Sequence, residues 1–186
     1  DMVRGYEHVK LGNVAEYRPV YEMLHAISHG KPVVAVTIAQ GDYHTPANLM
    51  RLAMAEAAAH SASYLSWPTW PEQYRKQMAA AVRPQADFLR QHADLLNGVS
   101  SSADVTVFLP FQRYLETPNC PVLETVRALS RANIQFDVAC EENFEKRLAA
   151  EPPKVLIADG ESALVPPEQA IMEKDKAAGG EVILSG

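Results

Sequence analysis

The sequence predicts an α/β protein whose strands form parallel sheets. Three observations support this class: an unbroken β-branched run at 33–38, helical and strand-like segments that alternate along the chain, and Gly and Pro residues at the expected helix ends. A β-branched run without polar alternation is typical of a strand that is buried on both faces of a parallel sheet. Alternating helices and strands are the pattern of repeated βα units.

The first half of the chain is expected to contain three helices and two strands. Gly30 stops the first helix, and Thr45 and Pro46 suit the N-cap and the first position of the second helix. Pro84 interrupts the third helix, because it removes a helical hydrogen bond. In order, the expected elements are a helix over 15–28, a strand over 33–38, a helix over 46–60, a strand over 62–67 and a helix over 72–96.

A short polar segment at 99–103 predicts a linker between two domains, 1–98 and 104–186. After it, strand-like runs alternate with helical spacing once more. Four strands with intervening helices predict a doubly wound sheet with helices on both faces, a three-layer α/β/α sandwich. The expected strands are 105–109, 134–139, 155–158 and 182–184, and the expected helices are 122–132, 144–148 and 167–178.

The composition argues against several classes of partner. With 47% hydrophobic and 22% charged residues, the chain is expected to fold around a core. The net charge of -6 opposes nucleic-acid binding, which draws on clustered Lys and Arg. No apolar run approaches the roughly 20 residues of a membrane span, and no nucleotide-binding motif is present. We therefore expect no nucleic acid, no membrane and no cofactor. Two cysteines are too few for a disulfide framework, so a reducing compartment such as the cytoplasm is favoured.

The histidines and cysteines give weak signals for chemistry. His25 and His29 lie four residues apart, a spacing that can hold zinc, but they lack the Glu of HExxH and a third ligand. A solvated helix end is the simpler interpretation. Cys140 precedes Glu141 and Glu142, whose charges would raise the pKa of the thiol and weaken it as a nucleophile. We expect neither a metal site nor a catalytic cysteine.

Three segments, taken in their order along the chain, resemble a family of bacterial β-galactosidases. The family joins a hydrolase barrel to a flavodoxin-like, amidotransferase-like trimerisation domain. The similar segments are 49–67, like the last barrel helix and strand; 122–138, like the first helix and second strand of the trimerisation domain; and 154–186, where Pro167-Glu168-Gln169 and Gly179-Gly180 stand at a helix start and before the last strand.

The resemblance implies the last βα units of a TIM-type barrel up to residue 98, then a flavodoxin-like sheet from 104 that stops after its fourth strand. Catalytic groups of such barrels lie at the carboxyl ends of the strands, and retaining glycosidases need two carboxyl groups about 5 Å apart. The acid/base would lie outside this chain. The nucleophile would fall at Thr37 to Gln40, where no carboxylate occurs. Asp42 is the nearest acid and a weak catalytic candidate, with a turn-forming loop Asp as the ordinary alternative.

Trp67 is the main expected substrate-binding residue. The resemblance places it at the end of the last barrel strand, where an aromatic face can stack on a pyranose. Core packing at the barrel rim is the alternative. Trp70, Tyr43 and His44 in adjoining loops complete the expected wall of a carbohydrate pocket.

Two functions from different classes stay open at this point. In the first, the chain is the carboxyl-side part of a glycoside-hydrolase-like protein and contributes barrel closure, a sugar-pocket wall and an oligomer contact, without a complete catalytic pair. In the second, it is a non-catalytic flavodoxin-like binding or assembly module. In both, an unpaired edge of the four-stranded sheet is expected to recruit another chain and to produce a homo-oligomer.

Overall fold

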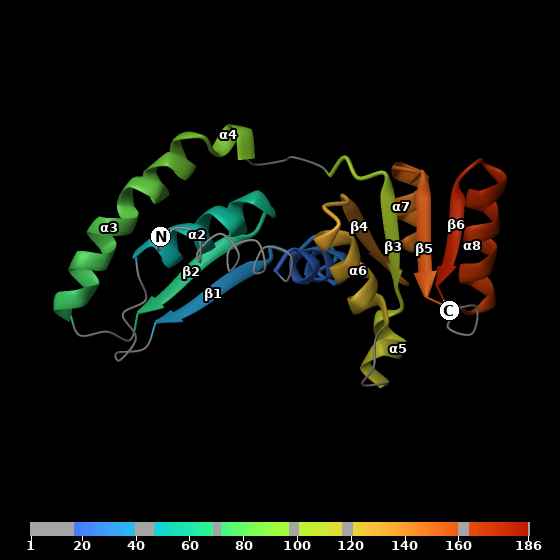
Figure 1. Ribbon diagram of the computed structural model, residues 1–186, viewed down its shortest axis with the longest axis horizontal. Helices are drawn as coiled ribbons and strands as arrows, with labels where there is room; N and C mark the ends of the chain where they lie inside the picture. The colour runs from blue at the N-terminus through green and yellow to red at the C-terminus, as the bar shows by residue number, and fades with distance from the viewer. Residues whose placement is uncertain are drawn as a thin grey trace. The chain divides into compact units, whose positions relative to one another are not determined.

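A computed structural model describes residues 17–39, 47–68, 72–96, 101–116, 121–159 and 164–185. They form helices and two parallel sheets, one of two strands and one of four (Figure 1). The chain divides into two compact units: Pro32–Ser100, and a second unit that combines Asp1–Lys31 with Ser101–Gly186. The predicted α/β class with parallel strands is confirmed.

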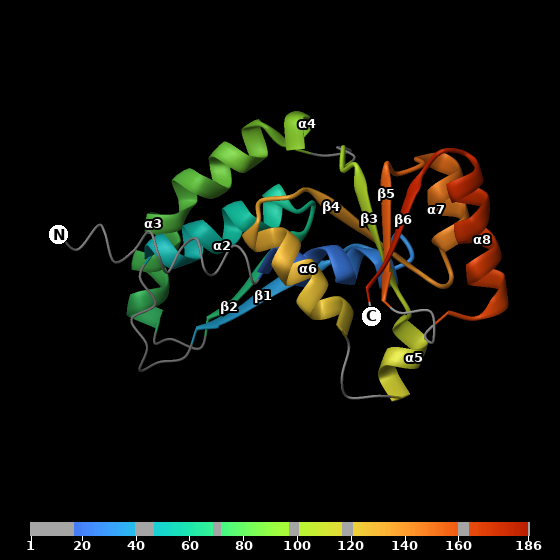
Figure 2. The ribbon, with the colours of Figure 1, turned by 45° about the vertical axis from the view of Figure 1, so that its right-hand side comes forward.

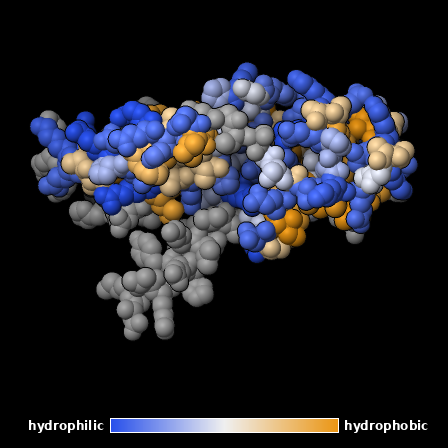
Figure 3. Space-filling model, turned by 90° about the horizontal axis from the view of Figure 1, so that it is seen from above, coloured by the Kyte–Doolittle hydropathy of each residue, from blue (hydrophilic) through white to orange (hydrophobic). Residues whose placement is uncertain are grey.

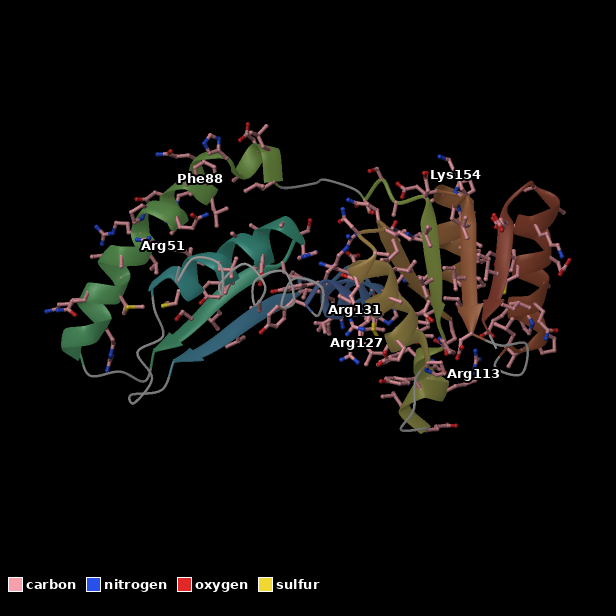
Figure 4. All side chains as sticks on the ribbon, viewed as in Figure 1. Arg51, Phe88, Arg113, Arg127, Arg131 and Lys154 are labelled. Carbon is pink, nitrogen blue, oxygen red and sulfur yellow. The ribbon has the colours of Figure 1, made fainter. Side chains whose placement is uncertain are left out.

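The unit Pro32–Ser100 holds the two-stranded sheet. The two strands are parallel, and α2 connects them and packs against both, while α3 packs on α2. Arg51 of α2 donates a hydrogen bond from Nε to the carbonyl oxygen of Ala81 in α3, at 2.9 Å (Figure 4). The elements are β1 (Val34–Ala39), α2 (Ala47–Ala59), β2 (Ser63–Pro68), α3 (Glu72–Gln91) and α4 (Ala93–Leu96).

The other unit is built on the four-stranded sheet, in the order β4-β3-β5-β6 with every neighbouring pair parallel. A helix over 17–27 precedes these strands in the chain. The remaining elements are β3 (Val105–Leu109), α5 (Phe111–Glu116), α6 (Pro121–Arg131), β4 (Phe136–Cys140), α7 (Phe144–Ala150), β5 (Val155–Asp159), α8 (Pro166–Ala177) and β6 (Glu181–Ser185).

The core of this unit lies in two layers, because successive side chains of a strand point to opposite faces of the sheet. Val107 and Leu109 of β3 pack on one face with α6 and the helix over 17–27. Phe108, between them, packs on the other face with α7 and α8. Figure 2 shows α6 on one side of the sheet and α7 and α8 on the other. The three-layer arrangement predicted from the alternating pattern is therefore present.

Three local features differ from the sequence expectations. α5 was not expected, and α3 continues through Pro84 to Gln91, where an interruption at the proline was expected. Val34 and Val36 are 50% and 52% exposed, so β1 is covered on one face only. The β-branched run correctly predicts the strand, but β2 and α2 together do not bury it.

The sequence predicted a single domain boundary, at 99–103. The structure divides the chain at a second point as well, between Lys31 and Pro32. Residues 17–31 were expected with the first domain, 1–98, but they group with the four-stranded unit. The contacts explain this grouping, because Ala26 packs in the core beside β3 and β4. Its carbonyl oxygen also accepts hydrogen bonds from Asn143 Nδ2 at 2.9 Å and Cys140 Sγ at 3.3 Å.

Candidate functional site

The carboxyl ends of β1 and β2 lie at the same edge of their sheet, because the two strands are parallel. Ile38 is opposite Trp67, and Ala39 is opposite Pro68. The backbone of Trp67 therefore lies beside the stretch where the family nucleophile was expected. The other candidate site residues, Asp42, Tyr43, His44 and Trp70, lie outside the residues that the structure describes, and so does Gln40. Of Trp67, the structure describes the backbone and not the side chain.

One face of this two-stranded sheet carries exposed apolar side chains. Val34, Val36 and Leu65 are 50%, 52% and 48% exposed, and the strand register places Val36 opposite Leu65. Ala35 and Tyr64, which point the other way, are less exposed. Parallel sheets occur almost only with both faces covered, and a lone strand pair is marginally stable. A face on which these apolar side chains are about half exposed is therefore unusual for a parallel sheet.

A second candidate site is the carboxyl edge of the four-stranded sheet. Ligands of doubly wound sheets bind where the strand order reverses, which here is between β3 and β5. At this place Arg113 of α5 donates two hydrogen bonds of 2.9 Å to the carboxylate of Glu168 in α8. Glu168 is buried and also accepts the Val165 backbone N–H at 2.9 Å. Figure 4 shows Arg113 near the carboxyl end of β3.

A second acid fills the start of α5. The Glu141 carboxylate accepts the backbone N–H groups of Phe111 at 2.8 Å and Gln112 at 3.1 Å. Orphan N–H groups at a helix start attract anions, and here the anion is supplied by the chain itself. Glu168 is thus bound by Arg113, and Glu141 by the first N–H groups of α5, so both carboxylates make contacts within the fold.

Cys140 is buried at the end of β4. Burial is the largest cause that raises the pKa of its thiol, and the charges of Glu141 and Glu142 raise it further. Hydrogen bonds from the backbone N–H groups of Glu142 and Asn143 act in the opposite direction. The expected direction is confirmed, although burial contributes more than the two acids. A thiol that stays protonated is a poor nucleophile.

His25 lies in the last turn of the helix over 17–27, and His29 lies in the turn that follows it. His29 Nε2 lies 2.7 Å from Glu142 Oε2 at the surface. Within the described ranges, no group of three or more His, Cys, Asp or Glu residues has the arrangement of a metal site. Over the same ranges, none of the helices combines the length and the apolar character that crossing a membrane requires.

Hydrophobic side chains also reach the surface of the four-stranded unit. A hollow of about 180 Å³ lies between the helix over 17–27, the end of β3 and α6. Its lining is apolar and includes Leu24, Leu109 and Phe111. In the view of Figure 3, hydrophobic residues appear in small groups separated by hydrophilic ones. The hollow offers no polar group that would orient a ligand.

Asp175 in α8 is a buried acid whose Oδ2 has no hydrogen-bond partner among the described residues. Burial raises the pKa of its carboxyl above the ordinary 3.8. The turn that follows fits closely around it. Gly179 has a φ of 102°, and a Cβ on Gly180 would collide with the Asp175 carboxylate. The glycine pair singled out from the sequence therefore has two different roles, a left-handed turn at Gly179 and a close approach at Gly180.

We expect Asp175→Asn to stabilise the protein at pH 7 by on the order of 1 kcal/mol, because it removes a buried, unpaired charge. Because burial raises the pKa of Asp175 in the folded state, the wild-type protein loses stability as the pH rises through that pKa and the carboxyl ionises. At low pH the carboxyl is protonated in both the folded and the unfolded state, so Asp175→Asn removes no charge there. The gain in Tm should therefore shrink as the pH falls to about 3. Thermal unfolding across this pH range measures it. Glu173→Gln, an exposed acid on the same helix, is the control and should show no such pH-dependent gain.

The chain matches no protein-family model, and no curated protein matches it.

Proposed function

We propose that the chain is the carboxyl-side part of a glycoside-hydrolase-like protein, with a TIM-type barrel followed by a flavodoxin-like domain. In this proposal, residues 32–100 close the barrel and supply a wall of a sugar pocket. The four-stranded unit provides an oligomer contact. The observation that carries the proposal is the uncovered apolar face of β1 and β2.

The uncovered face has the composition of a barrel interior. TIM-type barrels are filled by branched aliphatic side chains from alternate strands, and their helices cover the outer face. Val34, Val36 and Leu65 are such side chains, and α2 covers the opposite face. Burying one such side chain fully contributes about 1.5–3 kcal/mol. Further parallel strands beside β1 and β2 would supply that burial.

The carboxyl edge of the strand pair is where such a barrel binds its substrate. The register puts Trp67 at this edge, beside Ile38. The sequence Thr37-Ile38-Ala39-Gln40 offers no carboxylate that could attack an anomeric carbon. The chain therefore contributes a binding wall, with Trp67, Trp70, Tyr43 and His44 as the proposed contacts. Asp42 is the one nearby acid proposed for a catalytic or sugar-binding role.

The strand order supports the flavodoxin-like assignment of the second part. Numbered within the unit, β4-β3-β5-β6 is the order 2-1-3-4, which begins the flavodoxin-like order 2-1-3-4-5. Such sheets serve many unrelated functions, so the order alone assigns no ligand.

A specific observation favours the second function, a non-catalytic assembly module. The strand-order reversal is occupied by the Arg113–Glu168 ion pair, and Glu141 fills the start of α5. A domain that bound a small anion there would need these groups to be available. The four-stranded unit is therefore proposed to have a structural role in both functions.

Sugar binding by the natural protein is the test. We expect galactose or a β-galactoside to raise Tm in a saturable way, because a ligand that binds only the folded state stabilises it. Trp67→Ala should abolish the rise, since it removes the stacking surface. Thermal shift over a sugar titration measures both effects.

Tyr17→Ala is the matched control, because Tyr17 is an exposed aromatic residue of the other unit. It should leave the sugar response unchanged. A protein that shows no saturable response to any of a panel of sugars would contradict the sugar-pocket role. The same result with tight self-association would favour the assembly module.

A further inference from the structure

We draw no further inference here: the strongest candidate, the apolar hollow between the helix over 17–27, the end of β3 and α6, carries no proposal because nothing in the described part of the chain shows what covers it.

Discussion

Phe144→Ala is expected to lower the free energy of unfolding by about 3–5 kcal/mol, the range for a buried Phe whose removal leaves a cavity. Phe144 is the first residue of α7 and is almost completely buried. Its ring centroid lies 4.5 Å from that of Phe108 in β3, at a tilt of 39°. The substitution therefore removes both the burial and an aromatic pair between a helix and the central part of the sheet. Urea denaturation followed by circular dichroism measures the loss.

The matched control is the same substitution at an exposed position. Phe88 on α3 is 54% exposed and contacts His92, the residue that follows this helix. Phe88→Ala should change the free energy of unfolding by about 0.5 kcal/mol or less, as surface substitutions usually do. If Phe144→Ala lost no more stability than Phe88→Ala, the packing of α7 on the four-stranded sheet would be wrong.

Glu168→Gln is expected to have the second-largest effect, a loss of about 3 kcal/mol. Breaking a buried ion pair by removing one partner leaves the other charge unpaired, and the usual cost is about 3–5 kcal/mol. The lower end applies because the Arg113 side chain is 33% exposed and water can compensate part of the loss. The same carboxylate also accepts the Val165 N–H at the start of α8. Urea denaturation again gives the measurement.

Two comparisons separate the ion pair from a general effect of charge. Glu124→Gln breaks an exposed pair, Glu124–Arg127 at 3.0 Å, and should lose about 0.5 kcal/mol or less. Replacing both partners, with Arg113→Met and Glu168→Leu, should recover most of the stability that Glu168→Gln loses, because no buried charge is left unpaired. Equal losses for Glu168→Gln and Glu124→Gln would mean that Glu168 is solvated in solution.

The sequence predicts the strands well because each of them has a local signal. β3 and β5 are continuous apolar runs, and the structure places both within one residue of the expected bounds. α5 has no comparable signal. It is six residues long, and the group that satisfies its first N–H groups is Glu141, which lies 30 residues later in the chain. A helix that is capped from so far away cannot be recognised from its own residues.

Contacts between residues far apart in the sequence also limit what the sequence predicts about sites. The register between β1 and β2 follows from their parallel arrangement, so the neighbourhood of Trp67 could be anticipated. The Arg113–Glu168 pair joins residues 55 positions apart, and the helix start Pro167-Glu168-Gln169 gives no sign of a partner at Arg113. The packing of Ala26 against Asn143 spans 117 positions. Such contacts depend on the complete fold, and no local sequence pattern predicts them.

Residues 17–31 and 101–185 belong to one compact unit, and the residues between them form the other. Residues 32–100 are therefore connected to the four-stranded unit at both of their ends. A single proteolytic cut between those ends would release neither fragment, because Ala26 stays held by Asn143 and Cys140. Assembly of the four-stranded unit during synthesis must likewise wait until the ribosome has completed residues 32–100.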